Sequence, residues 1–105
     1  MSKASYFASL LQQGKTVEKY KEVGNSMLPI LKSNQPVTLI PVTEETVLRV
    51  NDIVFCKVKG NYYTHLIAAI RTRNSQVEYQ IANNHGFING WVKNKNIFGK
   101  VTKIW

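Results

Sequence analysis

Short runs rich in apolar, β-branched and aromatic residues occupy most of this chain, and they predict strands. The runs cover Val37–Val42, Ile53–Val58, Tyr62–Ile70, Gln76–Ile81, Phe87–Val92 and Phe98–Ile104. β-Branched and aromatic residues are frequent in these runs, and clusters of Gly, Asn, Ser and Pro separate them, as is typical of strands joined by turns. The pattern predicts a mainly β fold of several short antiparallel strands.

Two pairs of neighbouring runs are close enough in sequence to form hairpins. The first pair is joined through Lys59-Gly60-Asn61 and the second through Arg73-Asn74-Ser75. Gly and Asn tolerate the positive φ angles that tight hairpin turns require. We therefore expect the middle of the chain to be two consecutive hairpins that share the strand around His65.

The beginning of the chain has a different period. Tyr6, Phe7, Leu10 and Leu11 recur at helical spacing, which predicts a short helix from about Lys3 to Gln13 that ends at Gly14. Segment 1–14 is thus assigned to a short N-terminal helix and segment 16–105 to a β-domain, within a single domain spanning 1–105. Within the second part, 19–23 is expected to be extended and 28–32 to be a short strand.

Length and composition narrow the class of protein. The chain has 105 residues, of which 44% are hydrophobic and 19% charged, an ordinary globular balance. Its apolar runs are shorter than the roughly 20 residues that a spanning helix needs, and no secretory signal is recognisable, so we expect a soluble, cytoplasmic protein without a transmembrane anchor. The single cysteine, Cys56, and the distant His65 and His85 predict neither a disulfide nor a metal site, and no cofactor is expected.

The net charge of the chain indicates a class of binding partner. Fourteen Lys and Arg residues against six acids give a formal net charge of +8, which favours association with anionic partners. The basic residues are scattered along the sequence, so nucleic-acid binding is predicted to be weak and non-specific at most. A second route to nucleic acid, through basic residues interleaved with Tyr62, Tyr63, Phe87 and Trp91, ranks lower because aromatic residues at alternate strand positions are more often core.

One serine stands out by its local sequence, Gly24-Asn25-Ser26-Met27-Leu28-Pro29. Gly24 tolerates positive φ, and Pro29 can continue neither a helix nor a central strand. Ser26 is therefore expected to lie on a turn that presents its hydroxyl. A serine in a turn can also simply hydrogen-bond to its own backbone, and the hexapeptide alone does not decide between the two.

The order of later segments adds a resemblance. After the serine turn come Val50–Phe55, Tyr63–Ile67, Tyr79–Asn84 and Ile97–Val101. In that order and spacing, the chain from about Val23 onward resembles the catalytic domain of the signal peptidase and LexA-like serine peptidases, closest to the archaeal and endoplasmic-reticulum branch that uses histidine. The resemblance implies a coiled antiparallel β fold in which Ser26 is the nucleophile and His65 its general base. It also implies an oxyanion donor at the backbone N–H of Ser26, with a second donor from the preceding turn at Asn25.

The chain departs from that family where acids are expected. The histidine branch has Gly-Asp-Asn where this chain has Ala82-Asn83-Asn84, and Asn89 lies where a second acid is sometimes found. We expect Asn83 or Asn84 to lie near the imidazole and orient it in place of an acid, with His85 as a possible substitute base. Two functions stay open: a soluble Ser-His endopeptidase that binds an extended peptide by β-addition, and a peptidase-fold module that has lost catalysis and binds a protein or another acidic partner.

Overall fold

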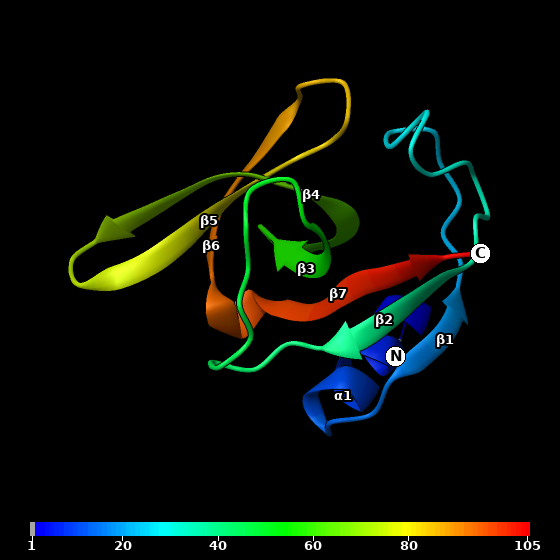
Figure 1. Cartoon of the computed structure of the whole chain (residues 1–105), viewed down its shortest axis with the longest axis horizontal. Coiled ribbons are helices and arrows are strands. Elements are labelled where there is room, and N and C mark those ends of the chain that lie inside the picture. The colour runs from blue at the N-terminus through cyan, green and yellow to red at the C-terminus, as the bar shows by residue number, and fades with distance from the viewer. Residues whose placement is uncertain (1) are drawn as a thin grey trace.

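A computed structural model describes residues 2–105 (Figure 1). Its elements are α1 (Lys3–Gln12), β1 (Val17–Tyr20), β2 (Val37–Pro41), β3 (Ile53–Val58), β4 (Asn61–Arg73), β5 (Gln76–Ala82), β6 (Ile88–Lys93), the 3₁₀ turn η1 (Asn94–Asn96) and β7 (Ile97–Ile104). The predicted mainly β fold with one short N-terminal helix is confirmed. The strands form a single seven-stranded sheet.

The seven strands lie in the order β1-β2-β7-β3-β4-β5-β6, and every neighbouring pair is antiparallel. The last strand of the chain, β7, is inserted between β2 and β3, so it joins the N-terminal strands to the central hairpins (Figure 1). Both predicted hairpins form. In the first, Lys59 (φ 50°) and Gly60 (φ 85°) make a two-residue turn between the paired residues Val58 and Asn61, the geometry that a right-handed strand twist favours.

Two apolar clusters fill the two faces of this sheet. The first packs α1 against the sheet through Leu11, Leu39 and Phe55, all at most 1% exposed. The second lies on the other side of β3 and contains Val54, Cys56, Ile67 and Ile81 among others. Because successive side chains of a strand point to opposite faces, the central strand β3 contributes to both clusters and is buried on both sides.

Ser26 lies in a turn, as the sequence suggested, but the residues after it do not form the expected strand. Residues 28–32 were expected to be a strand, but 26–30 form consecutive turns between β1 and β2. The Leu31 N–H donates to the Met27 carbonyl oxygen at 2.9 Å, which closes the chain on itself. Pro29 has no N–H to donate to a sheet, so a strand prediction centred on it was wrong. The extended strand before it covers 17–20, where 19–23 was expected.

Candidate active site

Apolar packing and hydrogen bonds together hold the loop around Ser26. Met27 (4% exposed) and Leu31 are buried in the cluster beneath α1, and burying two such side chains contributes about 1.5–3 kcal/mol each. Asn84 holds the loop from the β5–β6 connection: its N–H donates to the Ser26 carbonyl oxygen at 2.9 Å, and its Nδ2 donates to the Leu28 carbonyl oxygen at 2.8 Å. The Ser26 hydroxyl is therefore held in a defined place.

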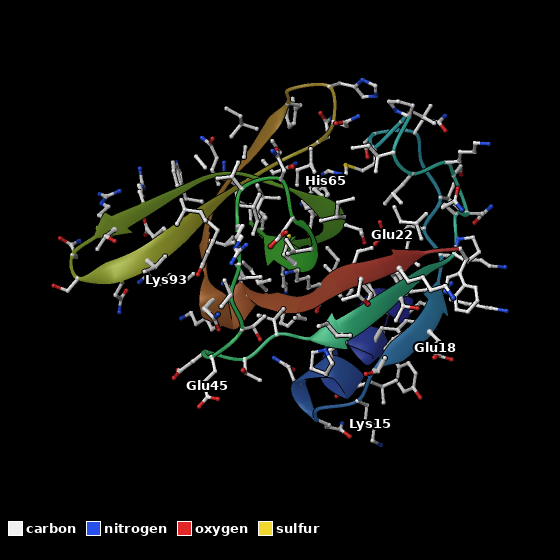
Figure 2. All side chains as sticks on the ribbon, viewed as in Figure 1. Lys15, Glu18, Glu22, Glu45, His65 and Lys93 are labelled. Atoms are coloured by element: carbon white, nitrogen blue, oxygen red, sulfur yellow. The ribbon has the colours of Figure 1, made fainter. Side chains whose placement is uncertain are left out.

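His65 reaches this loop because of where it lies in β4. Residues 61–66 of β4 pair with β3, whereas pairing with β5 begins only at Leu66. Across residues 2–105, no strand pairs with the second edge of β4 before that point. In Figure 2, His65 and Glu22 appear where the loop before β2 comes close to β4.

Ser26 and His65 are in hydrogen-bonding contact. The Ser26 Oγ lies 3.0 Å from the His65 Nε2, within the 2.6–3.2 Å or so expected of a nucleophile and its base. On the other side of the ring, Nδ1 lies 2.7 Å from the Asn89 Oδ1. An amide oxygen can only accept, so Nδ1 carries the proton and Nε2 is free to accept the proton of the serine hydroxyl. This is the tautomer that a general base needs.

The environment of His65 keeps the imidazole neutral. Only 6% of the residue is exposed, and burial lowers its pKa from the ordinary value of 6.5. The hydrogen bond to Asn89 and the negative charge of Glu22 act in the opposite direction but do not cancel the effect of burial on this pKa. The Tyr63 ring stacks on the imidazole, with centroids 4.7 Å apart and planes 26° from parallel.

Glu22 is a half-buried carboxylate beside this site. Its Oε1 accepts from the Tyr20 hydroxyl at 2.8 Å and from the Thr64 hydroxyl at 2.9 Å. Burial, together with this carboxylate, raises the pKa of Tyr20 above its ordinary range and that of the Cys56 thiol to about 12. Both groups are therefore neutral at physiological pH, and the thiol is an inert core group.

A small cavity opens next to Ser26. It measures about 40 Å³, and Glu22, Met27 and Thr64 are among the residues that line it with Ser26. Cavities of about 150 Å³ accommodate a benzene ring, so this one is too small for an aromatic side chain. It has room for a small side chain.

The structure corrects the expectation about Asn83 and Asn84. The Asn83 Oδ1 accepts from the N–H groups of His85 and Phe87, and the Asn84 side chain bonds to Leu28. The amide at the imidazole is that of Asn89. His85 is not bonded to Ser26 Oγ; its Nε2 lies 3.1 Å from the Asn25 carbonyl oxygen. The sequence had pointed to Asn89 only as a place where an acid sometimes occurs.

The two expected oxyanion donors, the N–H groups of Asn25 and Ser26, lie in the loop that carries the serine hydroxyl. Among the described residues, neither the Asn25 N–H nor the Ser26 N–H has a protein acceptor. Asn25 is exposed and Ser26 half-buried, so N–H groups that the protein leaves unpaired there are open to solvent or to a ligand. Their role as an oxyanion hole stays a prediction.

Two residues of the site were not singled out from the sequence. Tyr63 is two positions before His65 in β4, so alternation along a strand places both side chains on one face, and this signal was present in the sequence. Glu22 reaches Thr64 across 42 positions of sequence, and no local pattern reveals such a contact.

Other features place limits on the chemistry. Over the described residues, 2–105, no group of His, Cys, Asp and Glu is arranged to hold a metal ion. None of the helices described is long and apolar enough to cross a membrane. No protein-family model matches this chain, and a comparison with curated proteins found no significant match. Any functional conclusion thus depends on the geometry of the site.

Proposed function

We propose that this protein is a serine endopeptidase that uses a Ser26–His65 dyad on an extended peptide, as the resemblance to signal peptidase and LexA-like peptidases implies. The observation that carries the proposal is the chain of contacts from Ser26 Oγ through the imidazole to the Asn89 Oδ1. A free serine hydroxyl is a poor nucleophile at neutral pH and needs a base in this position.

In the proposed reaction, His65 takes the proton of Ser26 Oγ as that oxygen attacks the scissile carbonyl carbon. The N–H groups of Ser26 and Asn25 are free to stabilise the oxygen of the tetrahedral intermediate. The imidazolium then gives its proton to the leaving amine, which leaves an acyl-enzyme ester on Ser26. Water, activated by the same His65, hydrolyses the ester and restores the free serine.

The free edge of β4 supports the binding of an extended substrate. The Ile67 N–H donates to Asp52 on the β3 side, so strand alternation directs the backbone groups of Tyr62 and Thr64 to the opposite edge. A peptide strand added there would run past Ser26. The cavity of about 40 Å³ beside Ser26 favours a small residue next to the cleaved bond.

A serine-reactive fluorophosphonate tests the nucleophile directly. We expect it to label Ser26, with labelling lost in Ser26→Ala and reduced at least tenfold in His65→Ala, where the base is missing. Ser9→Ala is the matched control, since Ser9 lies on α1, where its hydroxyl contacts Gln13. Labelling of wild type and Ser26→Ala to the same extent would contradict the proposal.

A second candidate is a module that has kept this fold without catalysis and binds an acidic protein or another anionic partner. One observation favours it: Arg73 and Lys93 lie on one face of β4 and β6, on either side of Arg71, whose charge is paired with Glu78 at 2.8 Å. In Figure 2, Lys93 lies at the opposite side of the molecule from Glu22. Absence of both labelling and peptide cleavage, with retained binding to an acidic peptide, would favour this candidate.

A further inference from the structure

In the proposed reaction the His65 imidazole becomes positively charged, yet no carboxylate lies at its Nδ1. In Ser-His-Asp sites the aspartate stabilises the imidazolium that forms as the serine attacks. Here the partner at Nδ1 is the neutral amide of Asn89. The amide orients the ring but offers only a dipole to the charge, and the residue is 6% exposed, so water stabilises that charge little.

One face of the imidazole is covered by an aromatic ring. Tyr63 and His65 project from the same face of β4, their centroids are 4.7 Å apart, and the angle between the planes is 26°. The face of an aromatic ring carries negative electrostatic potential, and a cation within about 6 Å of its centroid is attracted to it, more strongly when water is excluded. A stacked imidazolium meets both conditions at this site.

We infer that Tyr63 is a positioning residue that stabilises the His65 imidazolium through its ring face, a task that a carboxylate at Nδ1 performs in Ser-His-Asp sites. The inference rests on the proposed function, because it assigns Tyr63 a part in the same proton transfer. It concerns the ring face of Tyr63 and not its hydroxyl, for which no hydrogen bond is seen within residues 2–105.

The supports of Tyr63 explain how the ring keeps this position. Tyr63 is half-buried and packs on the apolar cluster that contains Val54 and Ile67. Its backbone pairs with Cys56 in β3, and its carbonyl oxygen accepts from the Cys56 thiol at 3.7 Å. Glu22, from the loop before Ser26, is the charged group that acts on the His65 pKa. The Cys56 thiol and the Asn89 amide are neutral.

Comparing Tyr, Phe and Leu at position 63 distinguishes an effect of the aromatic ring face from an effect of simply covering the imidazole. Tyr63→Phe keeps the ring and removes the hydroxyl, and Tyr63→Leu keeps an apolar cover without a ring face. The first readout is the pKa of His65, which is measured by an NMR titration of the imidazole carbons. The variant His85→Asn serves as the control that assigns the His65 signal. The second is kcat on a peptide substrate that the wild-type protein cleaves.

If the ring face stabilises the cation, Tyr63→Leu lowers the His65 pKa by about one unit and kcat by about tenfold, since one unit corresponds to a factor of ten. Tyr63→Phe stays within about 0.3 unit of the wild-type His65 pKa and within about twofold of the wild-type kcat. KM should move little in either variant. If Tyr63→Leu fails to fold, Tyr63→Met, which is flexible enough to fill the same space, replaces it.

Equal pKa values for the Leu and Phe variants, or a higher pKa in Tyr63→Leu because water enters, would overturn the inference. So would a kcat that is the same in both. The outcomes are separable from those of the proposed function. A wild-type protein that cleaves no peptide but shows the pKa difference refutes the peptidase alone, whereas a peptidase insensitive to the ring refutes the inference alone.

Discussion

Replacing Asn89 by aspartate should convert the neutral partner of His65 into a charged one without changing its shape. The Asn89 Oδ1 lies 2.7 Å from Nδ1, so one carboxylate oxygen of Asn89→Asp would occupy a position already suited to accept the Nδ1 proton. Two opposite charges about 4 Å apart attract by about 4 kcal/mol at the effective dielectric of a protein surface. Part of this is lost because a carboxylate is harder to bury than an amide.

The net effect should be a rise of about 1–3 units in the His65 pKa and a gain of about 10–100-fold in kcat, at 1.36 kcal/mol per factor of ten. The opposite replacement in a Ser-His-Asp site costs about 10⁴ where it leaves the wrong tautomer. The gain is expected to be smaller here, because the Asn89 oxygen already holds the correct tautomer. What the aspartate adds is charge alone.

The measurement is the pH dependence of kcat/KM on a cleaved peptide, with an NMR titration of His65 in the same samples. A raised pKa keeps the imidazole protonated to higher pH, so the acid limb of the profile should move upward in pH while the plateau rises. Asn83→Asp is the matched control, since it adds the same charge at a side chain whose Oδ1 already accepts two backbone N–H groups and does not contact His65.

A gain in Asn83→Asp as large as that in Asn89→Asp would refute the reasoning, because it would show that added negative charge acts without contact with Nδ1. An unchanged His65 pKa in Asn89→Asp would refute it as well, since the charge could then not lie beside the imidazole. The sequence alone had pointed to position 83 for this experiment. The structure moves it to position 89.

Further predictions follow from the same structure. Burial lowers the His65 pKa below 6.5, so the acid limb of the activity profile should lie below pH 6.5. The unfolded chain binds the proton more tightly than the folded one, so the free energy of unfolding should fall as the pH drops from 6.5 toward the folded-state pKa. Urea denaturation at several pH values would show this fall. Gly99→Ala should destabilise the fold by about 1–3 kcal/mol, because its Cβ would lie 2.9 Å from the buried Leu11 Cδ1; a thermal midpoint equal to wild type would contradict this. Met27→Ala should cost about 2–5 kcal/mol and reduce fluorophosphonate labelling, because Met27 anchors the serine loop; unchanged labelling would show that the loop is held by Asn84 alone. Binding of single-stranded DNA should be weak and should fall steeply with salt, as a fluorescence-anisotropy titration at two ionic strengths would show; tight, sequence-selective binding at physiological salt would contradict it.

Much of the fold could be predicted from the sequence, because its signals are local. The apolar run 53–58 and the alternation in 76–81 both indicate strands, and Gly60 allows the positive φ that the first hairpin turn needs. The spacing of Tyr6, Phe7, Leu10 and Leu11 gives the helix, which ends at Gln12 as expected within a residue. The wrong strand at 28–32 also has a local cause, since its apolar residues follow a turn and not a pleated surface: Leu31 is buried there and Leu28 half-buried.

The composition of the site depended on tertiary structure. Which amide meets the imidazole was decided by the β5–β6 pairing: Ile81 pairs with Gly90 and Ala82 with Ile88, which leaves Asn89 as the extra, unpaired residue at an irregularity of β6. An extra residue of this kind redirects its side chain. The contact of Glu22 with Thr64 joins the β1–β2 loop to β4 across 42 positions of sequence. The sequence by itself determined which residue types were available, Ser26, His65 and a set of amides in place of acids. Only the pairing of distant strands decided which of them touch, because such contacts depend on register and loop path, which no local pattern encodes.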